Sequence, residues 1–211
     1  MEDRRGSPGR AAPGWGGRRV LSIGHSTRPL EDLVAALRAH GATCLVDVRT
    51  VPRSRHNPQY DGLALAEALP REGIRYVHVP ALGGLRHPLR ASPNGAWRDE
   101  GFRGFADHML TCEFEEGLVA LRGLAREGPV AVMCAEAVPW RCHRSLIADA
   151  LWARGVVVEH VIGSAPGRSH PHRPTPFALM EGRRVTYPAA SAVAGRRASQ
   201  SAGPADPPRS R

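Results

Sequence analysis

The sequence predicts an α/β domain in which helices cover both faces of a mostly parallel, five-stranded sheet. Two observations support this prediction. Short apolar segments of five to seven residues alternate with longer segments in which apolar residues recur at helical spacing. Glycines and prolines that favour turns separate the two kinds of segment. Such an alternation is typical of strand–helix–strand units, in which the strands run parallel and the helices form the outer two of three layers.

The apolar patterns give each element approximate bounds. The five strands are expected at residues 19–23, 43–48, 74–79, 130–134 and 156–162. The helices are expected at residues 29–40, 61–71, 101–111, 114–126 and 139–154. Pro29 and Pro139 fit the first turn of a helix, where a missing N–H costs no hydrogen bond. Gly41 and Gly155 fit the position just after a helix, and residues 86–100 are expected to be irregular.

The connections between these elements predict the order of the strands. Right-handed crossovers with one reversal after the third strand would give the order 3-2-1-4-5, counting strands along the chain. The first and fourth strands would then lie side by side. The loops that follow them would form two walls of one crevice at the carboxyl edge of the sheet, where α/β proteins bind ligands.

The chain of 211 residues has the length of one domain with flanking segments. We expect a disordered arm at 1–18, the α/β domain at 19–163, a partly ordered extension at 164–188 and a disordered basic tail at 189–211. The net charge of +9 comes from the flanks, because residues 1–19 carry five arginines against two acids and residues 164–211 carry eight against two. Basic arms can bind phosphate groups, so nucleic acid is one candidate partner.

The composition excludes several functional classes. The 29 cationic side chains are all arginines. Without lysine the chain has no phosphate-loop, Schiff-base or kinase-type lysine. It also lacks an apolar run of about 18 residues and an apolar leader segment, so we expect a cytoplasmic protein that makes no membrane contact. Four cysteines in a chain of this length are expected to be reduced rather than to form a disulfide scaffold.

The segment CAEAVPWRCHR, residues 134–144, has the composition of an active-site loop. It joins the end of a predicted strand to a predicted helix and carries two thiols, a carboxylate, an imidazole and two guanidiniums. Cys142 lies near the start of the helix, where the helix dipole, Arg141 and Arg144 would stabilise a thiolate. The alternative for Cys142 is a small residue that packs against the sheet. Cys134, at the end of the strand, is a second candidate nucleophile.

Other candidate residues lie at neighbouring strand ends. His25 or His143 would transfer protons. Glu136 would act as a general acid or base, or would form an ion pair with an arginine. The candidate substrate-binding residues are Ser26, Asp47, Arg49, Arg53, Arg55, Arg141 and Arg144. So many guanidiniums on the loops of an otherwise neutral domain predict an anionic ligand: a phosphate, a nucleotide, a nucleic acid or a carboxylate.

Two other chemistries use the same residues. Cys134, Cys142, His143 and His25 offer thiolate and imidazole ligands for zinc. Their spacing matches no finger or ribbon motif, and the adjacency of Cys142 and His143 argues against joint coordination, so we expect no metal or other cofactor and keep zinc as an alternative. Sulfur or phosphoryl transfer is a further alternative, because Cys134 followed by Arg141 is similar in layout to rhodaneses and cysteine phosphatases. This loop, however, lacks their run of small residues.

Five motifs in order along the chain resemble one family. IGHST, LVDVRTVPRSR, YVHVPALGGLR, VMCAE and PWRCHR resemble the bacterial family known as domain of unknown function 488. The resemblance covers about residues 19–163, and PHRPTPFALMEGRRVTYP resembles a tail segment of many members. It implies no activity, substrate or catalytic residue, so the roles above rest on residue chemistry alone.

From the sequence we therefore expect an enzyme that acts on an anionic substrate through a reactive cysteine at the carboxyl edge of its sheet. One alternative is a non-catalytic module that binds nucleic acid or a nucleotide. The other is a metal-dependent hydrolase.

Overall fold

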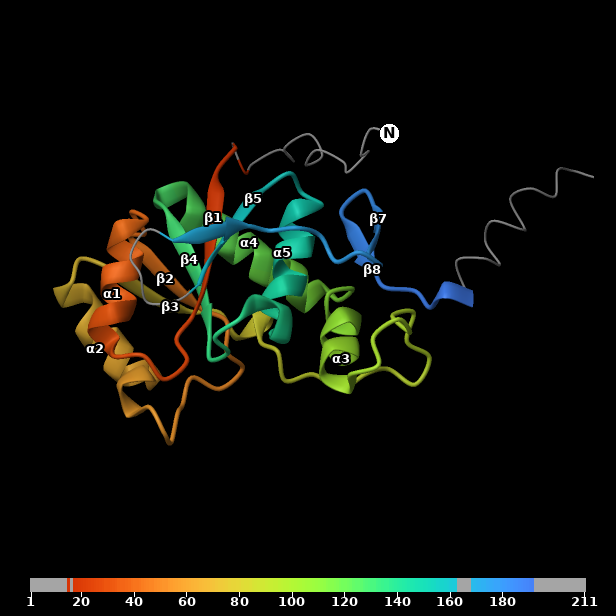
Figure 1. The fold of residues 1–211 in the computed structure, drawn as a ribbon. Coiled ribbons are helices and arrows are strands. Elements are labelled where there is room, and N and C mark those ends of the chain that lie inside the picture. The colour runs from red at the N-terminus through yellow and green to blue at the C-terminus, as the bar shows by residue number, and fades with distance from the viewer. Residues whose placement is uncertain (1–14, 16, 163–167, 192–211) are drawn as a thin grey trace, which may run out of the picture.

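The computed structural model describes residues 15, 17–162 and 168–191. The described residues form a six-stranded sheet and a separate two-stranded hairpin (Figure 1). The sheet contains β1 (Arg19–Gly24), β2 (Cys44–Asp47), β3 (Arg75–His78), β4 (Val130–Cys134), β5 (Val157–Val161) and β6 (Ser169–Pro171). Its first five strands run parallel, and β6 pairs antiparallel with β5. The hairpin consists of β7 (Leu179–Glu181) and β8 (Arg184–Thr186).

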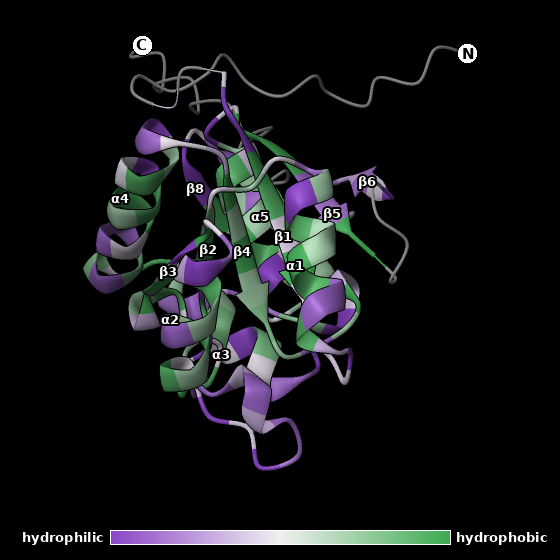
Figure 2. Cartoon of the chain, turned by 90° about the vertical axis from the view of Figure 1, so that its left-hand side faces the viewer, coloured by the Kyte–Doolittle hydropathy of each residue, from purple (hydrophilic) through white to green (hydrophobic). Residues whose placement is uncertain are grey.

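Helices cover both faces of the sheet, which confirms the predicted α/β class. The helices are α1 (Leu30–Ala39), α2 (Gly62–Arg71), α3 (Glu100–His108), α4 (Cys112–Glu127) and α5 (Arg144–Trp152). The described residues also form three short 3₁₀ turns: η1 (Pro58–Tyr60), η2 (Pro80–Leu82) and η3 (Pro139–Arg141). The pairs α1 and α2, and α4 and α5, lie on opposite sides of the strands (Figure 1). The strands at the centre of the molecule are its most apolar part (Figure 2).

The predicted strand order is wrong at one position. The observed order is β3-β2-β4-β1-β5-β6, so β4 lies between β2 and β1 instead of outside β1, and the sheet has six strands instead of five. All five residues of β4 are buried, and their side chains alternate between the two hydrophobic cores, with Val132 in one and Met133 in the other. A strand that is apolar on both faces is stable at the centre of a parallel sheet. The predicted neighbours β1 and β4 are nonetheless paired, with Gly24 opposite Cys134.

The last helix begins later than predicted. Pro139 opens η3, which closes when the Cys142 N–H donates to the Pro139 carbonyl at 3.0 Å. Cys142 itself is extended, with φ −142° and ψ 145°, and α5 begins only at Arg144. The predicted single helix from residue 139 to 154 is therefore two elements with an extended residue between them. This break sets the direction of the Cys142 side chain.

The segment after β5 packs on the domain through Asp149, a buried residue of α5. The Asp149 carboxylate accepts hydrogen bonds from His172, Thr175 and the hydroxyl of Tyr187, at 2.6–2.9 Å. Trp15, from the arm predicted to be disordered, is only 3% exposed and belongs to the core on the α4 and α5 side. The rest of the expected N-terminal arm up to residue 14, and the tail from residue 192, lie outside the described residues. In the described part of the chain, every helix is too short or too polar to cross a membrane.

Candidate functional site

The carboxyl ends of β1, β2 and β4 bring the predicted functional residues to one edge of the sheet, but on two faces. Gly24 and Cys134 are opposite each other in the β1–β4 pair. Because side chains alternate along a strand, His25 points to the face opposite that of Cys134. Asp47 shares the face of His25. The edge therefore carries two polar clusters, back to back.

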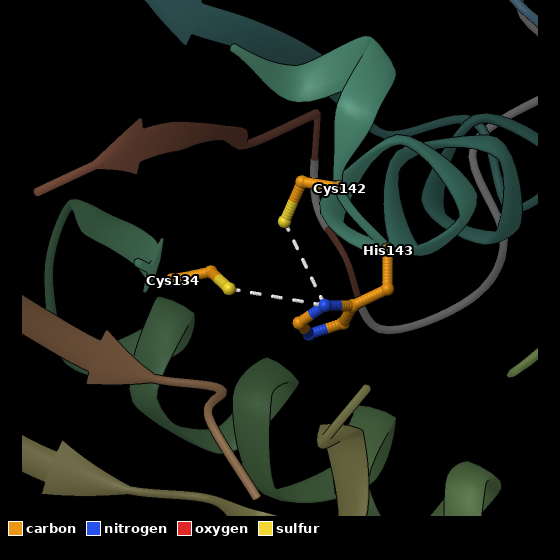
Figure 3. A group of neighbouring side chains, drawn as sticks. All are labelled: Cys134, Cys142 and His143. Carbon is orange, nitrogen blue, oxygen red and sulfur yellow. Dashed lines mark hydrogen bonds between the residues drawn. The ribbon is translucent and has the colours of Figure 1, made fainter. Parts of the chain in front are cut away.

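The first cluster, here called the thiol cluster, consists of Cys134, Cys142 and His143 (Figure 3). Nδ1 of His143 lies 3.6 Å from the sulfur of Cys142 and 3.8 Å from that of Cys134. Nε2 of His143 lies 3.0 Å from the carbonyl oxygen of Val48. Because a carbonyl oxygen only accepts, Nε2 carries the ring proton, and Nδ1 presents its lone pair to the two sulfurs.

A buried guanidinium supports the thiol cluster from behind. Arg144 is 1% exposed, and its Nε donates to the sulfur of Cys142 at 3.4 Å. Its two other nitrogens donate to the hydroxyl of Ser22 at 3.1 Å and to the carbonyl of Glu136 at 2.5 Å. A Cβ at Gly24 would overlap this carbonyl and the guanidinium, so only glycine fits there. All three contacts fix the cation of Arg144 beside the Cys142 sulfur.

These contacts divide the protons between the two thiols. The pKa of the Cys142 thiol is lowered, chiefly because the Cys134 thiol donates a hydrogen bond to its sulfur. The Arg144 guanidinium, which donates to the same sulfur, also stabilises the thiolate, against the cost of burial. The pKa of Cys134 is raised, because Cys134 is the donor in this hydrogen bond and is itself buried. Cys142 is therefore the thiolate of the pair.

The thiol cluster opens into a cavity of about 430 Å³. Side chains from several loops, from α3 and from η3 line the cavity with the thiol cluster: Arg49, Thr50, Val51, Arg53, Leu85, Asp99, Phe102, Glu136 and Arg141. Arg53, Glu136 and Arg141 are exposed at its rim. The cavity is large enough for a small molecule, and around its buried thiolate it carries two exposed guanidiniums, of Arg53 and Arg141, and two exposed carboxylates, of Asp99 and Glu136.

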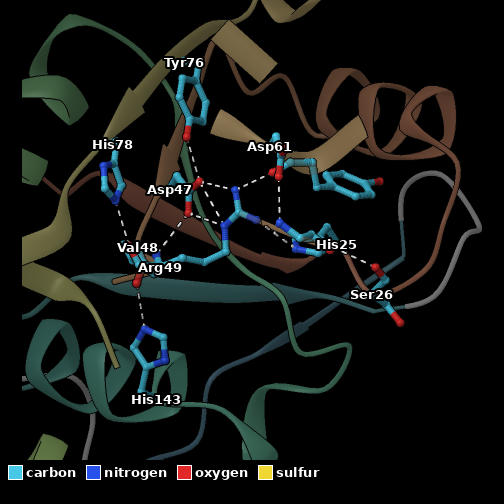
Figure 4. A network of polar contacts seen from close by, with 11 residues as sticks. His25, Ser26, Asp47, Val48, Arg49, Asp61, Tyr76, His78 and His143 are labelled. Atoms are coloured by element: carbon cyan, nitrogen blue, oxygen red, sulfur yellow. Dashed lines mark hydrogen bonds and ion pairs between the residues drawn. The ribbon is translucent and has the colours of Figure 1, made fainter. Parts of the chain in front are cut away.

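The second cluster is built on an ion pair between Asp47 and Arg49 (Figure 4). Both side chains are buried, and the guanidinium donates to both carboxylate oxygens, the shortest contact being 2.6 Å. The Tyr76 hydroxyl donates to the same carboxylate at 2.8 Å, and Arg49 also donates to the Tyr60 carbonyl at 2.7 Å. The ion pair is thus saturated with partners, as a buried pair must be. It holds Arg49 against the wall of the cavity.

His25 belongs to this second cluster. Its Nδ1 donates to the carbonyl of Ser26 at 2.8 Å, so its Nε2 is the acceptor that faces Arg49 at 3.4 Å. Its ring stacks on Tyr60, with 4.1 Å between ring centroids. Burial, and secondarily the charge of Arg49, lowers the pKa of His25 to about 4. His25 is therefore neutral, and its ring is packed on the face away from the thiol cluster.

The structure brings together most of the predicted site residues and separates a few. Cys134, Cys142, His143, Glu136, Arg49, Arg53 and Arg141 line the cavity. Arg144 supports it from behind, whereas His25 and Asp47 lie on the opposite face with their own partners. Ser26 accepts from His25 through its backbone carbonyl and donates its N–H to the Ala135 carbonyl at 2.9 Å. Arg55 is exposed on the loop before η1.

Sequence reasoning did not select three residues that shape the site. Ser22 and the Val48 carbonyl orient Arg144 and His143, and Gly84 leaves the space that the His143 ring occupies. A Cβ at Gly84 would overlap that ring. The signal for Gly84 was the Gly83-Gly84 dipeptide after the third strand, because paired glycines mark close approach as well as turns. The backbone carbonyl of Val48 has no signal in the sequence.

Comparisons with known proteins gave one match. A family model described as a domain of unknown function, DUF488, matches residues 29–151. This range contains the thiol cluster, the Asp47–Arg49 pair and Gly84, and it begins after His25 and Ser26. Neither the curated proteins nor the solved structures gave a match.

Proposed function

We propose that this chain, which belongs to the family of the domain of unknown function DUF488, is an enzyme that acts on a small anionic substrate through the sulfur of Cys142. One observation carries the proposal. The Arg144 guanidinium donates to the Cys142 sulfur at the inner end of a cavity whose rim carries Arg53 and Arg141. A cation fixed beside a sulfur stabilises the thiolate, which is the nucleophilic form of cysteine. Two further cations at the rim favour an anionic substrate.

The residues around Cys142 support a covalent mechanism. The sulfur would donate an electron pair to an electrophilic atom of the substrate, and the leaving group would depart with its own bonding pair. Nδ1 of His143, which faces both sulfurs, would accept a proton from the water or acceptor molecule that releases the bound group. Glu136, which lines the cavity, would orient that molecule. The reaction class is thus a thiol-dependent transfer or hydrolysis.

The charged side chains at the rim of the cavity affect how well an anionic substrate binds beside the thiolate. A thiolate and an anionic substrate repel each other, and the charge of Arg49 is already matched by Asp47. Arg53 and Arg141 supply positive charge that this ion pair does not cancel, although Asp99 and Glu136 on the same lining carry two negative charges. At about 6 Å and an effective dielectric constant of about 40, each guanidinium attracts a monoanion by about 1.4 kcal/mol, or tenfold in occupancy. The two rim arginines should therefore control the affinity for the anion.

Alkylation by two reagents that differ in charge tests this proposal. Iodoacetate is an anion and iodoacetamide is its neutral counterpart. We expect the ratio of their rates at Cys142, followed by mass spectrometry, to exceed the ratio for glutathione by about tenfold or more. The rate with iodoacetate should saturate with concentration, and inorganic phosphate should compete with it.

Arginine variants provide the control. Arg53→Met and Arg141→Met should each lower the ratio about tenfold, whereas Arg126→Met, at an exposed position on α4, should leave it unchanged. The proposal is wrong if Cys142 shows the same ratio as glutathione, or if the rim variants do not change it. Compounds that compete with iodoacetate are then the ones to assay for turnover, which Cys142→Ser should abolish.

A further inference from the structure

We infer that Cys134, Cys142 and His143 also bind a soft divalent cation such as Zn²⁺, and that the bound cation masks the reactive sulfur. The binding site goes beyond the proposed function and stands on geometry alone. The masking rests on the proposed function, because it concerns the same sulfur. Each residue offers one donor atom, and the three atoms lie within 4.8 Å of one another.

The two sulfur–nitrogen distances match those around a tetrahedral ion. With Zn–S bonds of about 2.3 Å and a Zn–N bond of about 2.05 Å, each sulfur lies about 3.6 Å from the nitrogen. The observed distances from Nδ1 of His143 are 3.6 Å to Cys142 and 3.8 Å to Cys134. The nitrogen therefore needs almost no movement relative to either sulfur to hold an ion of this size, and the two sulfurs lie within 4.8 Å of each other.

The surroundings of the donors resemble the outer shell of a metal site. The Val48 carbonyl accepts from Nε2 of His143, which leaves the Nδ1 lone pair available and fixes the direction of the ring. The ring also packs on Phe105, with 4.9 Å between centroids. Arg144 donates to the Cys142 sulfur, and such hydrogen bonds moderate the charge of a ligating thiolate. Two sulfurs and an imidazole nitrogen favour zinc over magnesium or calcium.

The backbone removes the objection that adjacent residues cannot share one ion. Cys142 is extended, whereas His143 has helical torsions of φ −55° and ψ −15°. This change of conformation between neighbours turns both side chains toward Cys134 (Figure 3). All three residues line the cavity, so an ion reaches them from the cavity, and water or an anion there can complete its coordination.

Masking follows from the chemistry of a coordinated thiolate. An electron pair on sulfur that is shared with a cation is less available to an electrophile. The cation would therefore protect Cys134 and Cys142 from alkylation together. It would switch the centre between a reactive form and a closed form according to the supply of the ion.

Cobalt titration of the full-length, reduced and chelator-treated protein tests the site. Co²⁺ takes tetrahedral sulfur sites as Zn²⁺ does, and its thiolate complexes absorb in the near ultraviolet. We expect one equivalent to produce this band, and one equivalent of Zn²⁺ to displace it and to block iodoacetamide at Cys142. Cys134→Ser, Cys142→Ser and His143→Gln should each lose the band. Cys112→Ser, at an exposed position on α4, should keep it.

The outcomes separate the two proposals. No cobalt–thiolate band with the wild-type protein, or an undiminished band in the three ligand variants, overturns the cation site. Circular dichroism of those variants shows that a lost band does not reflect a lost fold. If Zn²⁺ binds but leaves the alkylation rate of Cys142 unchanged, the masking is wrong. If the cation binds while the cation-free protein shows no preference for iodoacetate, the proposed function is wrong and the cation site stands.

Discussion

Acidification should destabilise the fold through His25. The imidazole is 2% exposed, stacks on Tyr60 and accepts from Arg49 through Nε2. Protonation of Nε2 would turn this acceptor into a donor that faces another donor, in a buried position beside a cation. Arg49 and, more weakly, Arg144 oppose the extra charge, and Asp47 only partly offsets them. The folded protein therefore resists a proton that the unfolded chain accepts.

The magnitude follows from the lowered pKa. The pKa of His25 is 6.5 in the unfolded reference and about 4 in the folded state. Between these values the unfolded chain binds more protons, so the free energy of unfolding falls as the pH falls through this window. From pH 7 to pH 5 the loss is about 2 kcal/mol, and it approaches about 3 kcal/mol below pH 4.

Denaturant unfolding at several pH values measures this loss. We compare the wild-type protein with His25→Gln, whose side chain can still accept from Arg49 but does not titrate. The variant has its own stability at pH 7, so the informative quantity is the change from pH 7 to pH 5. This change should be smaller in the variant by about 2 kcal/mol. Equal changes in the two proteins would show that His25 is not the buried, neutral group described above.

Two further predictions concern the neighbours of the site. Asp47→Ala leaves Arg49 buried without its anion and should lower the free energy of unfolding by about 3–5 kcal/mol. Tyr76→Phe removes one hydrogen bond to the same carboxylate and should lower it by about 1 kcal/mol. Equal losses for the two variants in chemical denaturation would contradict this ranking. Gly84→Ala should displace the His143 ring and weaken Co²⁺ binding at least tenfold. The control is Gly123→Ala, whose Cβ would meet no atom within 4 Å and which should bind Co²⁺ as the wild-type protein does. Unchanged cobalt affinity in Gly84→Ala would refute the described packing.

The strands and helices were predictable from the sequence because each depends on the pattern of apolar residues within its own segment. The order of the strands in the sheet was not predictable in this way. Apolar runs and helical spacing located the five parallel strands and the main helices. The position of β4 between β2 and β1 depends on which strand is most stable at the centre of the sheet, and that is a comparison among all the strands. β4 suits a central place because its side chains are apolar on both faces, but β2 and most of β1 are buried as well, so the apolar pattern does not decide which of the three lies between the others.

The arrangement of the site residues was likewise only partly predictable from the sequence. Cys134 ends a strand and Cys142 precedes the following helix, so the sequence placed both thiols on one loop without indicating how close they lie. His25 was assigned to the wrong face, although the alternation of side chains after Gly24 could have indicated its direction. The extended torsions of Cys142 direct its sulfur toward the ring of His143, and no pattern in the sequence predicts these torsions.

The short strand β6 also affects how the molecule meets other copies of itself. An uncovered edge strand offers its N–H and C=O groups to any passing chain and so promotes aggregation. β6 occupies the β5 side of the sheet and ends in Pro171, which has no N–H to donate. On the opposite side, β3 is four residues long and begins with the exposed, charged Arg75. Both margins of the sheet are therefore poor templates for strand addition, which favours solubility at high concentration.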